Sequence, residues 1–252
     1  MPDIFNRLKR LRRKIRNRTE KAILDFNMIQ HGDRLLLGVS GGADSLSLLH
    51  FFLNGFPHVT PEFTFLAVYV NTGLNKNPEK LENHFKSLNI DYRILDTTIA
   101  RQALDPDAGK NPCFICSLYR RREIYKIAVE ENCNKIAYGH HKDDMIETLL
   151  LNILFGRKIE GMNPVQEIFK GNLRIIRPFT YIDECLLKQF AYEADLPVLS
   201  RNCPVDGYSR RDKIKKIIRD LQREEMNANI RENIFKSFYH VNMDFTRDIR
   251  PG

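Results

Sequence analysis

Hydrophobic and polar positions alternate along the chain in blocks that predict strands followed by helices. Five short apolar runs have the length of buried strands: 34–39, 65–70, 92–95, 135–138 and 173–176. Apolar positions recur at helical spacing in the segments between and after them: 45–53, 78–88, 117–131, 143–155 and 183–194. Because strands that alternate with helices form parallel sheets, the pattern predicts an α/β fold, a parallel sheet with helices on both faces.

Two basic segments flank this α/β region. Apolar residues recur at helical spacing over 5–28, with a break at the polar stretch 16–21, which predicts one or two helices. Residues 209–223 predict a basic helix near the other end. We therefore expect three parts: a basic N-terminal helical segment at 1–30, the α/β domain at 31–200 and a C-terminal helical segment at 201–252.

The positive charge of the chain is concentrated at its N-terminus. The 252 residues contain 40 Lys and Arg against 32 Asp and Glu, a net charge of +8. Residues 1–21 hold nine basic and two acidic side chains, so this segment carries +7 and the other 231 residues carry +1. Such a dense block of positive charge favours contacts with the phosphates of a nucleic acid, although a solvated helix face remains the alternative. The expected contacts are Arg7, Arg10, Arg12, Arg13, Lys14 and Arg16, with Arg210, Arg211 and Lys215 in a second patch.

The lengths of the apolar runs also indicate the cellular compartment in which we expect the protein. None approaches the roughly 20 residues of a membrane-spanning helix, and the basic N-terminus lacks the apolar core of a signal peptide. We therefore expect a cytoplasmic protein without a membrane partner. In that reducing compartment, the five cysteines are expected to bind metal, do chemistry or pack, and not to form disulfides.

A glycine loop joins the first predicted strand to the first predicted helix. It reads LGVSGGADS over 37–45. Backbone N–H groups at such a junction point toward the carboxyl edge of the sheet, where they can bind an anion. Glycine lets the backbone approach the anion closely, and the hydroxyls of Ser40 and Ser45 add donors. The loop lacks both the GK[ST] of a Walker loop and the GxGxxG of a dinucleotide site. An ordinary glycine turn is the alternative.

SGGADS resembles the SGGxDS signature of the PP-loop ATP pyrophosphatases, which hydrolyse ATP between its α- and β-phosphates. The resemblance implies that the loop holds the pyrophosphate portion of ATP and that Asp44 helps to place Mg²⁺. A later segment, GHHKDD at 139–144 followed by Glu147 and Thr148, resembles the GHxxDD-x-x-ET of the same family, whereas alone it would be read as a polar helix cap. The implied ATP-binding residues are Gly38, Ser40, Gly41, Gly42, Asp44, Ser45, Val70, Asn71, Gly139, His140 and Asp144.

Three cysteines are candidates for chemistry. Cys113 and Cys116 form a CxxC in the loop before a predicted helix, and Cys203 lies 87 residues after Cys116. We assign Cys133 and Cys185 to packing. A closed zinc site needs a fourth ligand, and no other cysteine is suitably spaced. A redox couple is the second alternative. Three thiolates would hold a cubane iron–sulfur cluster and leave one iron without a protein ligand.

The combination resembles the tRNA 2-thiocytidine synthetase family and related cluster-dependent tRNA thiolases. The similarity extends over CFICSLYRRREIY, KIAYGHHKDDMIETLLLNILFGRKIEGMNP, RIIRPF and NCP. It implies that Cys113, Cys116 and Cys203 hold a [4Fe-4S] cluster, and it places Arg120 near the reaction centre. Two positions depart from the family. Ala43 replaces its usual lysine, so one phosphate contact is either missing or supplied by Lys142 or Arg120. Cys203-Pro204 is closer to the 2-thiouridine relatives.

The resemblance implies an ATP-dependent tRNA sulfurtransferase that forms AMP and pyrophosphate. ATP would adenylate a base carbonyl, at C2 of an anticodon-loop cytidine, and sulfur delivered through the cluster would replace the oxygen. The catalytic residues would be Asp44, Arg120, Cys113, Cys116 and Cys203. The implied partners are tRNA, a sulfur donor (a cysteine desulfurase system or sulfide) and a second copy in a homodimer. Two alternatives remain: a PP-loop enzyme acting on another RNA base or a non-RNA substrate, and a redox-sensing nucleic-acid-binding protein.

Overall fold

Contacts between residues divide the chain into two compact units. The computed structural model describes residues 2–59, 61–75, 77–108, 111–200, 203–205, 207 and 209–242. The first unit is Met1–Lys142 with Asn163–Gly207, and the second is Asp143–Met162 with Tyr208–Gly252. The division into segments 1–30, 31–200 and 201–252 remains a prediction.

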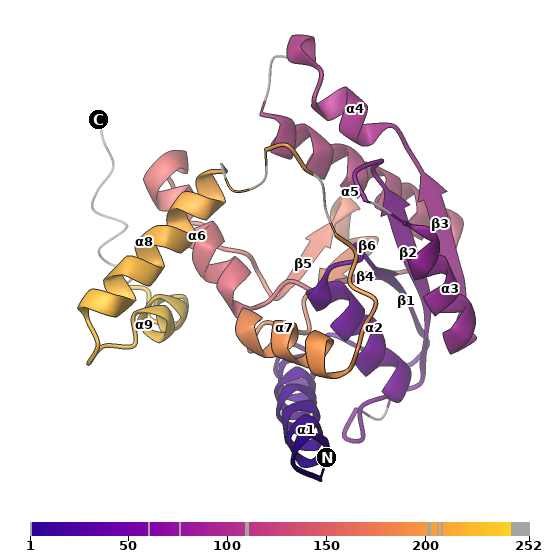
Figure 1. Ribbon diagram of the computed structural model, residues 1–252, viewed down its shortest axis with the longest axis horizontal. Helices are drawn as coiled ribbons and strands as arrows, with labels where there is room; N and C mark the ends of the chain where they lie inside the picture. Colours follow the sequence, from indigo (N-terminus) through magenta and orange to yellow (C-terminus); the bar gives the residue numbers. More distant parts are fainter. Residues whose placement is uncertain are drawn as a thin grey trace. The chain divides into compact units, whose positions relative to one another are not determined.

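A six-stranded sheet forms the centre of the first unit (Figure 1). Its strands are β1 (Asp33–Gly38), β2 (Phe63–Asn71), β3 (Tyr92–Asp96), β4 (Lys135–Tyr138), β5 (Val165–Ile168) and β6 (Leu173–Ile176). The order is β3-β2-β1-β4-β6-β5, and every neighbouring pair is parallel except β5 and β6. The order reverses between β1 and β4, which opens a crevice at their carboxyl ends, where ligands of such sheets bind. The predicted α/β fold is confirmed.

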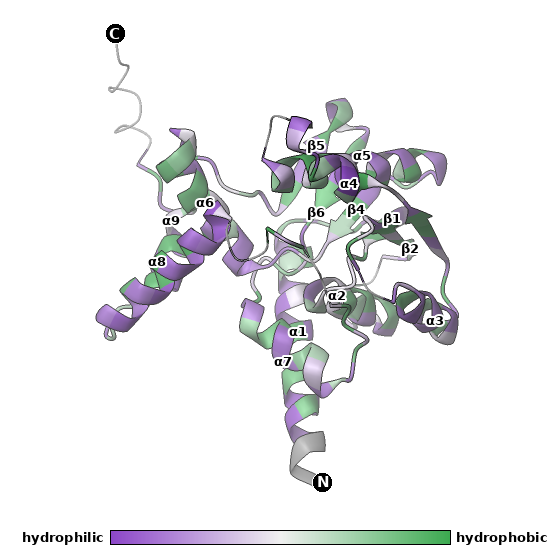
Figure 2. Ribbon diagram, turned by 45° about the horizontal axis from the view of Figure 1, so that its top comes forward, coloured by the Kyte–Doolittle hydropathy of each residue, from purple (hydrophilic) through white to green (hydrophobic). Residues whose placement is uncertain are grey.

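Helices cover both faces of this sheet. They are α1 (Pro2–Asp25), α2 (Ala43–Asn54), α3 (Glu79–Leu88), α4 (Ile99–Ala103), α5 (Pro112–Glu130) and α7 (Glu184–Glu193), with short 3-10 turns at Pro106–Ala108 and Phe169–Gly171. One core cluster joins α1, α2, α3 and α7 to the sheet, and a second joins α4 and α5 to its other face. Figure 2 shows β1 and β2 in the green of apolar residues. Among the helices of the described residues, none is long and apolar enough to span a lipid bilayer.

The N-terminal segment is one continuous helix, so of the two alternatives that the pattern left open, one helix or two, the structure has the first. The hydroxyl of Thr19 donates to the carbonyl of Ile15 at 2.8 Å, which satisfies it inside the helix. The buried Glu20 carboxylate accepts from the backbone N–H of His58 at 3.2 Å, and its other oxygen lies 3.0 Å from the ring nitrogen Nδ1 of that histidine. Arg18 pairs with Asp183, the N-cap of α7, at 3.1 Å. These polar residues continue the helix because tertiary partners satisfy them.

The helix that carries the CxxC begins earlier than predicted. Asn111 caps it, since its side-chain oxygen accepts from the backbone N–H of Cys113 at 2.9 Å. Pro112 occupies the first turn, where its missing N–H costs nothing. Cys113 and Cys116 therefore lie in the first turns of α5, and the predicted loop position is corrected.

Three smaller elements were missed by the sequence pattern. The edge strand β5 reads VQEI, with polar residues at its two central positions, and it pairs only with β6. The short helix α4 and the helix α9 (Ile230–Ser237) have too few turns for a clear apolar period. Each depends on tertiary contacts that no local pattern reports.

The described residues of the second unit include three helices, which are joined by ion pairs. They are α6 (Lys142–Gly156), α8 (Arg210–Glu224) and α9. On α6, the buried Asp143 pairs with Arg231 of α9. Asp144 pairs with Arg211 of α8 at 2.6 Å, and the buried Glu147 lies 3.6 Å from Lys215 of the same helix. The carboxylates of Asp143, Asp144 and Glu147 therefore link α6 to the other two helices.

Because Ile15 is fully buried in the first core cluster, α1 is part of the domain and not a detachable tail. Ile15→Ala is expected to lower the free energy of unfolding by about 2–5 kcal/mol, the usual range for a buried truncation of this size. Leu24→Ala is the matched control on the same helix, because that side chain is 57% exposed. Urea unfolding of both variants measures the difference, and equal stabilities would show that α1 is not packed as described.

Candidate active site

The glycine loop between β1 and α2 is closed by its own two serines. The backbone N–H of Ser40 donates to the hydroxyl oxygen of Ser45 at 3.0 Å, and the two hydroxyl oxygens lie 3.1 Å apart. Ser45 in turn donates to the carbonyl of Gly42 at 3.1 Å. Asp44 lies in the first turn of α2. The loop is thus held in one shape, with the N-terminus of α2 at its end.

Glycine is required where other parts of the first unit approach the loop. A Cβ at Gly38 would lie 2.8 Å from the ring of Tyr138 at the end of β4. A Cβ at Gly139 would lie 3.0 Å from the backbone of Asp44. The first distance is closer than side chains tolerate, and the second is tighter than most Cβ contacts, so β4 lies close to the loop with little room for a side chain at either position.

Gly41 meets a third segment. Its φ is +78°, and a Cβ there would lie 2.7 Å from the side chain of Leu199. The backbone N–H of Leu199 donates to the carbonyl of Gly41 at 2.9 Å. Leu199 is buried and follows α7. The chain that leads toward Cys203 is therefore attached to the loop.

The second histidine of the GHHKDD segment lies close to Asp44. His141 is buried, and its Nε2 lies 3.9 Å from a carboxylate oxygen of Asp44. His140, the predicted nucleotide neighbour, packs its ring against Tyr138 with centroids 5.3 Å apart. Burial raises the pKa of Tyr138 well above its ordinary value, so this phenol stays protonated. Sequence reasoning missed His141, although the HH doublet was its available signal.

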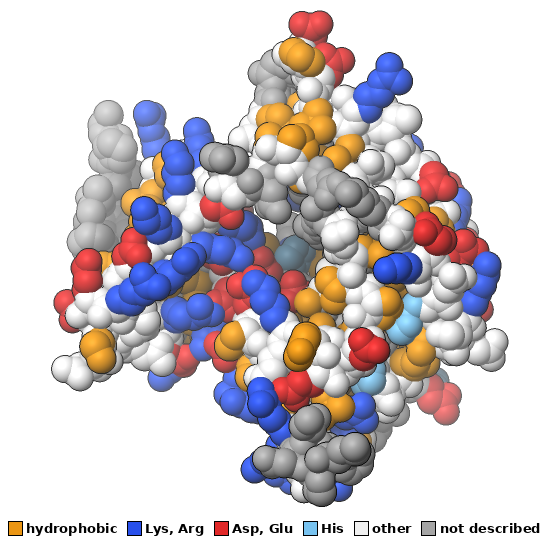
Figure 3. All heavy atoms as spheres, in the orientation of Figure 1, with side chains coloured by type: hydrophobic (Ala, Val, Ile, Leu, Met, Phe, Trp, Pro, Cys, Tyr) orange, Lys and Arg blue, Asp and Glu red, His pale blue; other side chains and the backbone are white. Residues whose placement is uncertain are grey.

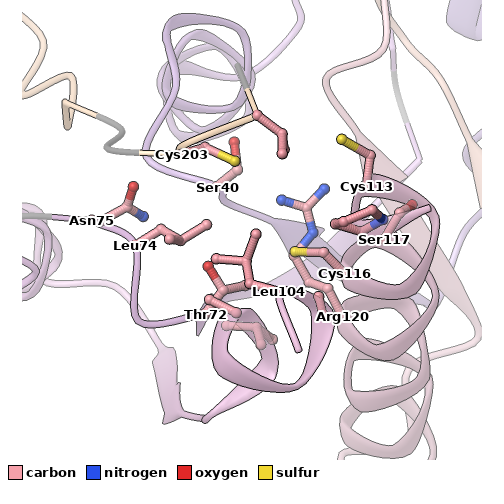
Figure 4. A pocket seen from close by; sticks show the side chains of 15 residues that line it. Ser40, Thr72, Leu74, Asn75, Leu104, Cys113, Cys116, Ser117, Arg120 and Cys203 are labelled. Carbon is pink, nitrogen blue, oxygen red and sulfur yellow. The ribbon is translucent and has the colours of Figure 1, made fainter. Parts of the chain in front are cut away.

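A cavity of about 200 Å³ lies beside the loop within the first unit (Figure 4). Its wall includes six of the residues expected at the site: Ser40, Val70, Cys113, Cys116, Arg120 and Cys203. The fold thus gathers the glycine loop, the end of β2, the first turns of α5 and the segment after α7 around one space. Asn71 is not part of this wall, because its side chain donates to Asp96 at 2.9 Å and accepts from the backbone of Gly73.

One face of α5 supplies three of the cavity side chains. Cys113, Cys116 and Arg120 are spaced three and four residues apart, which places them on the same side of the helix. Figure 4 shows the Arg120 guanidinium pointing into the cavity, with Cys203 on the opposite wall beside Ser40. Of the two cations proposed to replace the family's lysine at Ala43, Arg120 shares the cavity with Ser40. Lys142 lies 3.6 Å from Asp183.

The cysteines are chemically suited to an iron–sulfur cluster. None of the five, all of which belong to the described residues, forms a disulfide. Three of them line the one cavity, and soft thiolates are the ligands of such clusters. Among the described residues no three His, Cys, Asp or Glu side chains are grouped closely enough for a single metal ion. Cys133 packs in the second core cluster, whereas Cys185 is exposed and its assignment to packing is wrong.

The basic residues expected to bind nucleic acid fall into two groups. Arg10, Arg12, Arg13, Lys14 and Arg210 are exposed. The others have structural contacts or are partly covered: Arg7 pairs with Glu193 at 2.8 Å, Arg16 is half-buried, and Arg211 and Lys215 pair with carboxylates of α6. Figure 3 shows Lys and Arg side chains gathered over α8.

Comparison with known proteins identifies the family. The model of the PP-loop domain matches residues 9–221. The chain belongs to the PP-loop family. Two similar relatives are the tRNA-cytidine(32) 2-sulfurtransferases of Anaeromyxobacter dehalogenans (strain 2CP-C) and Dechloromonas aromatica (strain RCB). Each is 35% identical; the first match covers 94% of this chain and 82% of the relative, and the second 94% and 83%. The resemblance expected from the motifs is confirmed.

A similar solved structure supports the fold. It is described as "U34-tRNA thiolase NcsA from Methanococcus maripaludis with its [4Fe-4S] cluster". The match has a TM-score of 0.70 at 21% identity and covers 98% of this chain and 80% of that chain. At this identity the likeness establishes the shared fold.

The contact between Gly41 and Leu199 generates a prediction for the PP-loop. Gly41→Ala places a methyl group against Leu199 and distorts the loop, so affinity for ATP is expected to fall at least about tenfold, or 1.4 kcal/mol. Gly32→Ala is the matched control: its φ is +80°, so the backbone cost is similar, but nothing lies within 4 Å of the added Cβ. Equilibrium binding of ATP to both variants tests this, and equal losses would refute the contact.

Proposed function

We propose that the protein is an ATP-dependent tRNA sulfurtransferase that replaces the C2 carbonyl oxygen of a tRNA cytidine with sulfur. The observation that carries the proposal is the single cavity lined by both Ser40 of the PP-loop and the three cysteines. Replacing an activated carbonyl oxygen with sulfur needs both an ATP-binding loop and a set of ligands for sulfur chemistry in one space. The names of the relatives at 35% identity support tRNA and cytidine as the substrate.

The PP-loop would serve the activation step. The base oxygen attacks the α-phosphate of ATP, an O–P bond forms, and pyrophosphate leaves. Backbone N–H groups of the loop and the N-terminus of α2 would bind the departing phosphates. Asp44 would help to place Mg²⁺, which neutralises the charge that develops on them. Arg120, the cation that lines the cavity, would stabilise the same charge.

The cysteines would serve the exchange step. Cys113, Cys116 and Cys203 would hold a [4Fe-4S] cluster, which would supply sulfur at the sulfide level for the exchange. Exchange at C2 of the adenylated base would form a C–S bond, break the C–O bond and release AMP with the former carbonyl oxygen. Because the thiolates act as ligands, they need not become persulfides. The cavity walls of Val70, Ala100 and Leu104 would keep water from competing for the activated carbon.

Several finer points belong to the same proposal. The sulfur would come from a cysteine desulfurase system or from sulfide, the enzyme would work in the cytoplasm as a homodimer, and its ATP would be bound with Mg²⁺. Thiolation of uridine is the second candidate, because Cys203-Pro204 resembles the 2-thiouridine enzymes. Mass spectrometry of tRNA nucleosides from cells that lack this protein separates the two, since either 2-thiocytidine or 2-thiouridine disappears.

The cysteine assignment predicts the effect of single substitutions. Cys113→Ala, Cys116→Ala and Cys203→Ala are each expected to abolish thiolation and to lower the iron bound per chain after anaerobic purification, while ATP binding persists. Cys185→Ala is the matched control, because that thiol is exposed and is not part of the cavity wall. A Cys203→Ala enzyme with a full complement of iron and wild-type thiolation would disprove the assignment.

The exposed cations of α1 would bind the tRNA backbone. Lys9, Arg10 and Arg13, together with Asn6, line one surface depression of about 340 Å³. Their density of charge suits phosphates, whose binding weakens as salt rises.

Reversing two of these charges tests the surface. Arg10→Glu combined with Arg13→Glu is expected to weaken tRNA binding more than about tenfold and to reduce its salt dependence, because roughly two phosphate contacts are lost. Stability should be unchanged, since both side chains are exposed. Lys80→Glu with Lys86→Glu on α3 changes the net charge equally and is the control. Equal effects of the two pairs, measured by fluorescence anisotropy, would exclude α1 as a specific binding surface.

A further inference from the structure

The outer face of α5 carries a groove that the proposed reaction does not use. Its volume is about 640 Å³. The wall combines apolar, aromatic and cationic side chains, among them Leu118, Arg121, Arg122, Tyr125, Val129 and Phe169. Large apolar surfaces are exposed here: Leu118 by 42%, Val129 by 69% and Phe169 by 57%. A groove of this composition is suited to a ligand with both flat apolar surfaces and negative charge.

Two aromatic rings form a fixed platform in the groove. The rings of Tyr125 and Phe169 meet edge to face, with centroids 5.6 Å apart and an angle of 89°. Tyr125 is anchored because it packs against the second core cluster. Phe169, in the turn between β5 and β6, has a φ of 51°, and Lys170 beside it has a φ of 59°. A bulky residue rarely adopts this left-handed conformation, and such strain gathers at functional sites.

The positive charge of the groove comes from two arginines. In the part of the chain that the structure describes, no carboxylate pairs with the guanidinium of Arg121 or Arg122, although Arg121 donates to the carbonyl of Ser117 in its own helix. The nearby acids are already engaged. Glu130 pairs with Arg93 at 2.7 Å, and Glu123 pairs with Lys126 at 2.8 Å. Arg121 and Arg122 therefore present net positive charge beside the two rings.

This pairing of features favours single-stranded RNA over a second copy of the chain. Unpaired bases stack on exposed aromatic rings, and guanidinium groups contact the phosphates beside them. Suppose instead that the α5 helices of two copies packed against each other about a two-fold axis, through their exposed residues between Phe114 and Val129. Arg121 and Arg122 lie at the middle of this range, so those of both copies would meet at the axis. Four like charges would then repel one another.

We propose that this groove binds an unstacked nucleotide of the RNA substrate, with the base against Phe169 and Tyr125 and the phosphates at Arg121 and Arg122. This inference rests on the proposed function, since it assumes an RNA substrate. Arg120 faces the cavity while Arg121, the next residue, faces the groove. Nine residues of helix separate Cys116 from Tyr125, or roughly 13 Å along the axis. The groove thus holds a nucleotide a short way along the strand from the base that reacts.

The aromatic half of the proposal is tested by removing one ring. The full chain, purified anaerobically, is titrated against a fluorescent hairpin RNA with an unpaired loop. Phe169→Ala is expected to lower the affinity at least about fivefold, because stacking on one ring is lost. Phe169→Tyr should retain the affinity, since it keeps the ring. Tyr192→Ala on α7 is the matched control, because that aromatic side chain is 87% exposed and lies outside the groove.

The cationic half is tested by the double variant Arg121→Ala with Arg122→Ala. The slope of log affinity against log salt should fall by roughly 1.4, the value for two contacts with a single strand. ATP affinity, measured in parallel, should not change. These results together support the groove.

Three outcomes overturn the inference, and they are distinguishable. If the wild type binds RNA and the groove variants bind it equally well, the groove is not an RNA site. If the variants instead change the molecular mass in sedimentation equilibrium, the groove is an interface between copies. If the wild type binds no RNA, the proposed function fails together with the inference. If Phe169→Ala weakens RNA binding but the wild type thiolates no tRNA, the groove is an RNA site and the proposed sulfurtransferase activity is wrong.

Discussion

The close approach of two backbones at the carboxyl ends of β1 and β4 is the constraint on which the site depends. The two strands pair in parallel with Gly38 opposite Tyr138, so their following loops must pass within van der Waals distance of each other. Gly38 leaves room for the Tyr138 ring, and Gly139 leaves room for the backbone of Asp44. A side chain at Gly38 would clash with the Tyr138 ring, and one at Gly139 would force the backbone of Asp44 to shift. The register of β1 against β4 thus brings the PP-loop and the GHHKDD segment together at one edge of the sheet.

The helix α5 then places different chemistry on neighbouring faces. Asn111 and Pro112 set where the helix begins, and this start determines which side of it each later residue occupies. Cys113, Cys116 and Arg120 consequently face the cavity with the PP-loop. The residues between and after them form the groove with Phe169. A shift of one residue in the helix start would rotate every later side chain by about 100° and mix these two surfaces.

Ion pairs divide the basic residues by role. Arg7, Arg18 and Lys142 of the first unit pair with carboxylates of α7 or of its N-cap. In the second unit Arg211 and Lys215 meet the acids of α6. Charge that is paired in this way contributes to folding and is less available for phosphate. The +7 of the first 21 residues is therefore an upper limit on what α1 offers to RNA, and the exposed Arg10 and Arg13 represent the available part.

The sequence by itself determined the local features of the protein. Its apolar periods predicted the five parallel strands, its glycine and cysteine motifs predicted the PP-loop family, and its charge predicted the basic helices. Strands such as β1 are buried on both faces, so their apolar runs identify them without tertiary information. The edge strand β5 was not predicted, and the pattern left open whether α1 is one helix or two, because polar residues in both elements are stabilised by partners far along the chain. Tertiary structure alone decided that His141 approaches Asp44, that Leu199 is attached to the PP-loop, and that Phe169 meets Tyr125. Each of these contacts joins residues whose separation along the chain exceeds any local period, so only the packing of the folded sheet and helices brings them together.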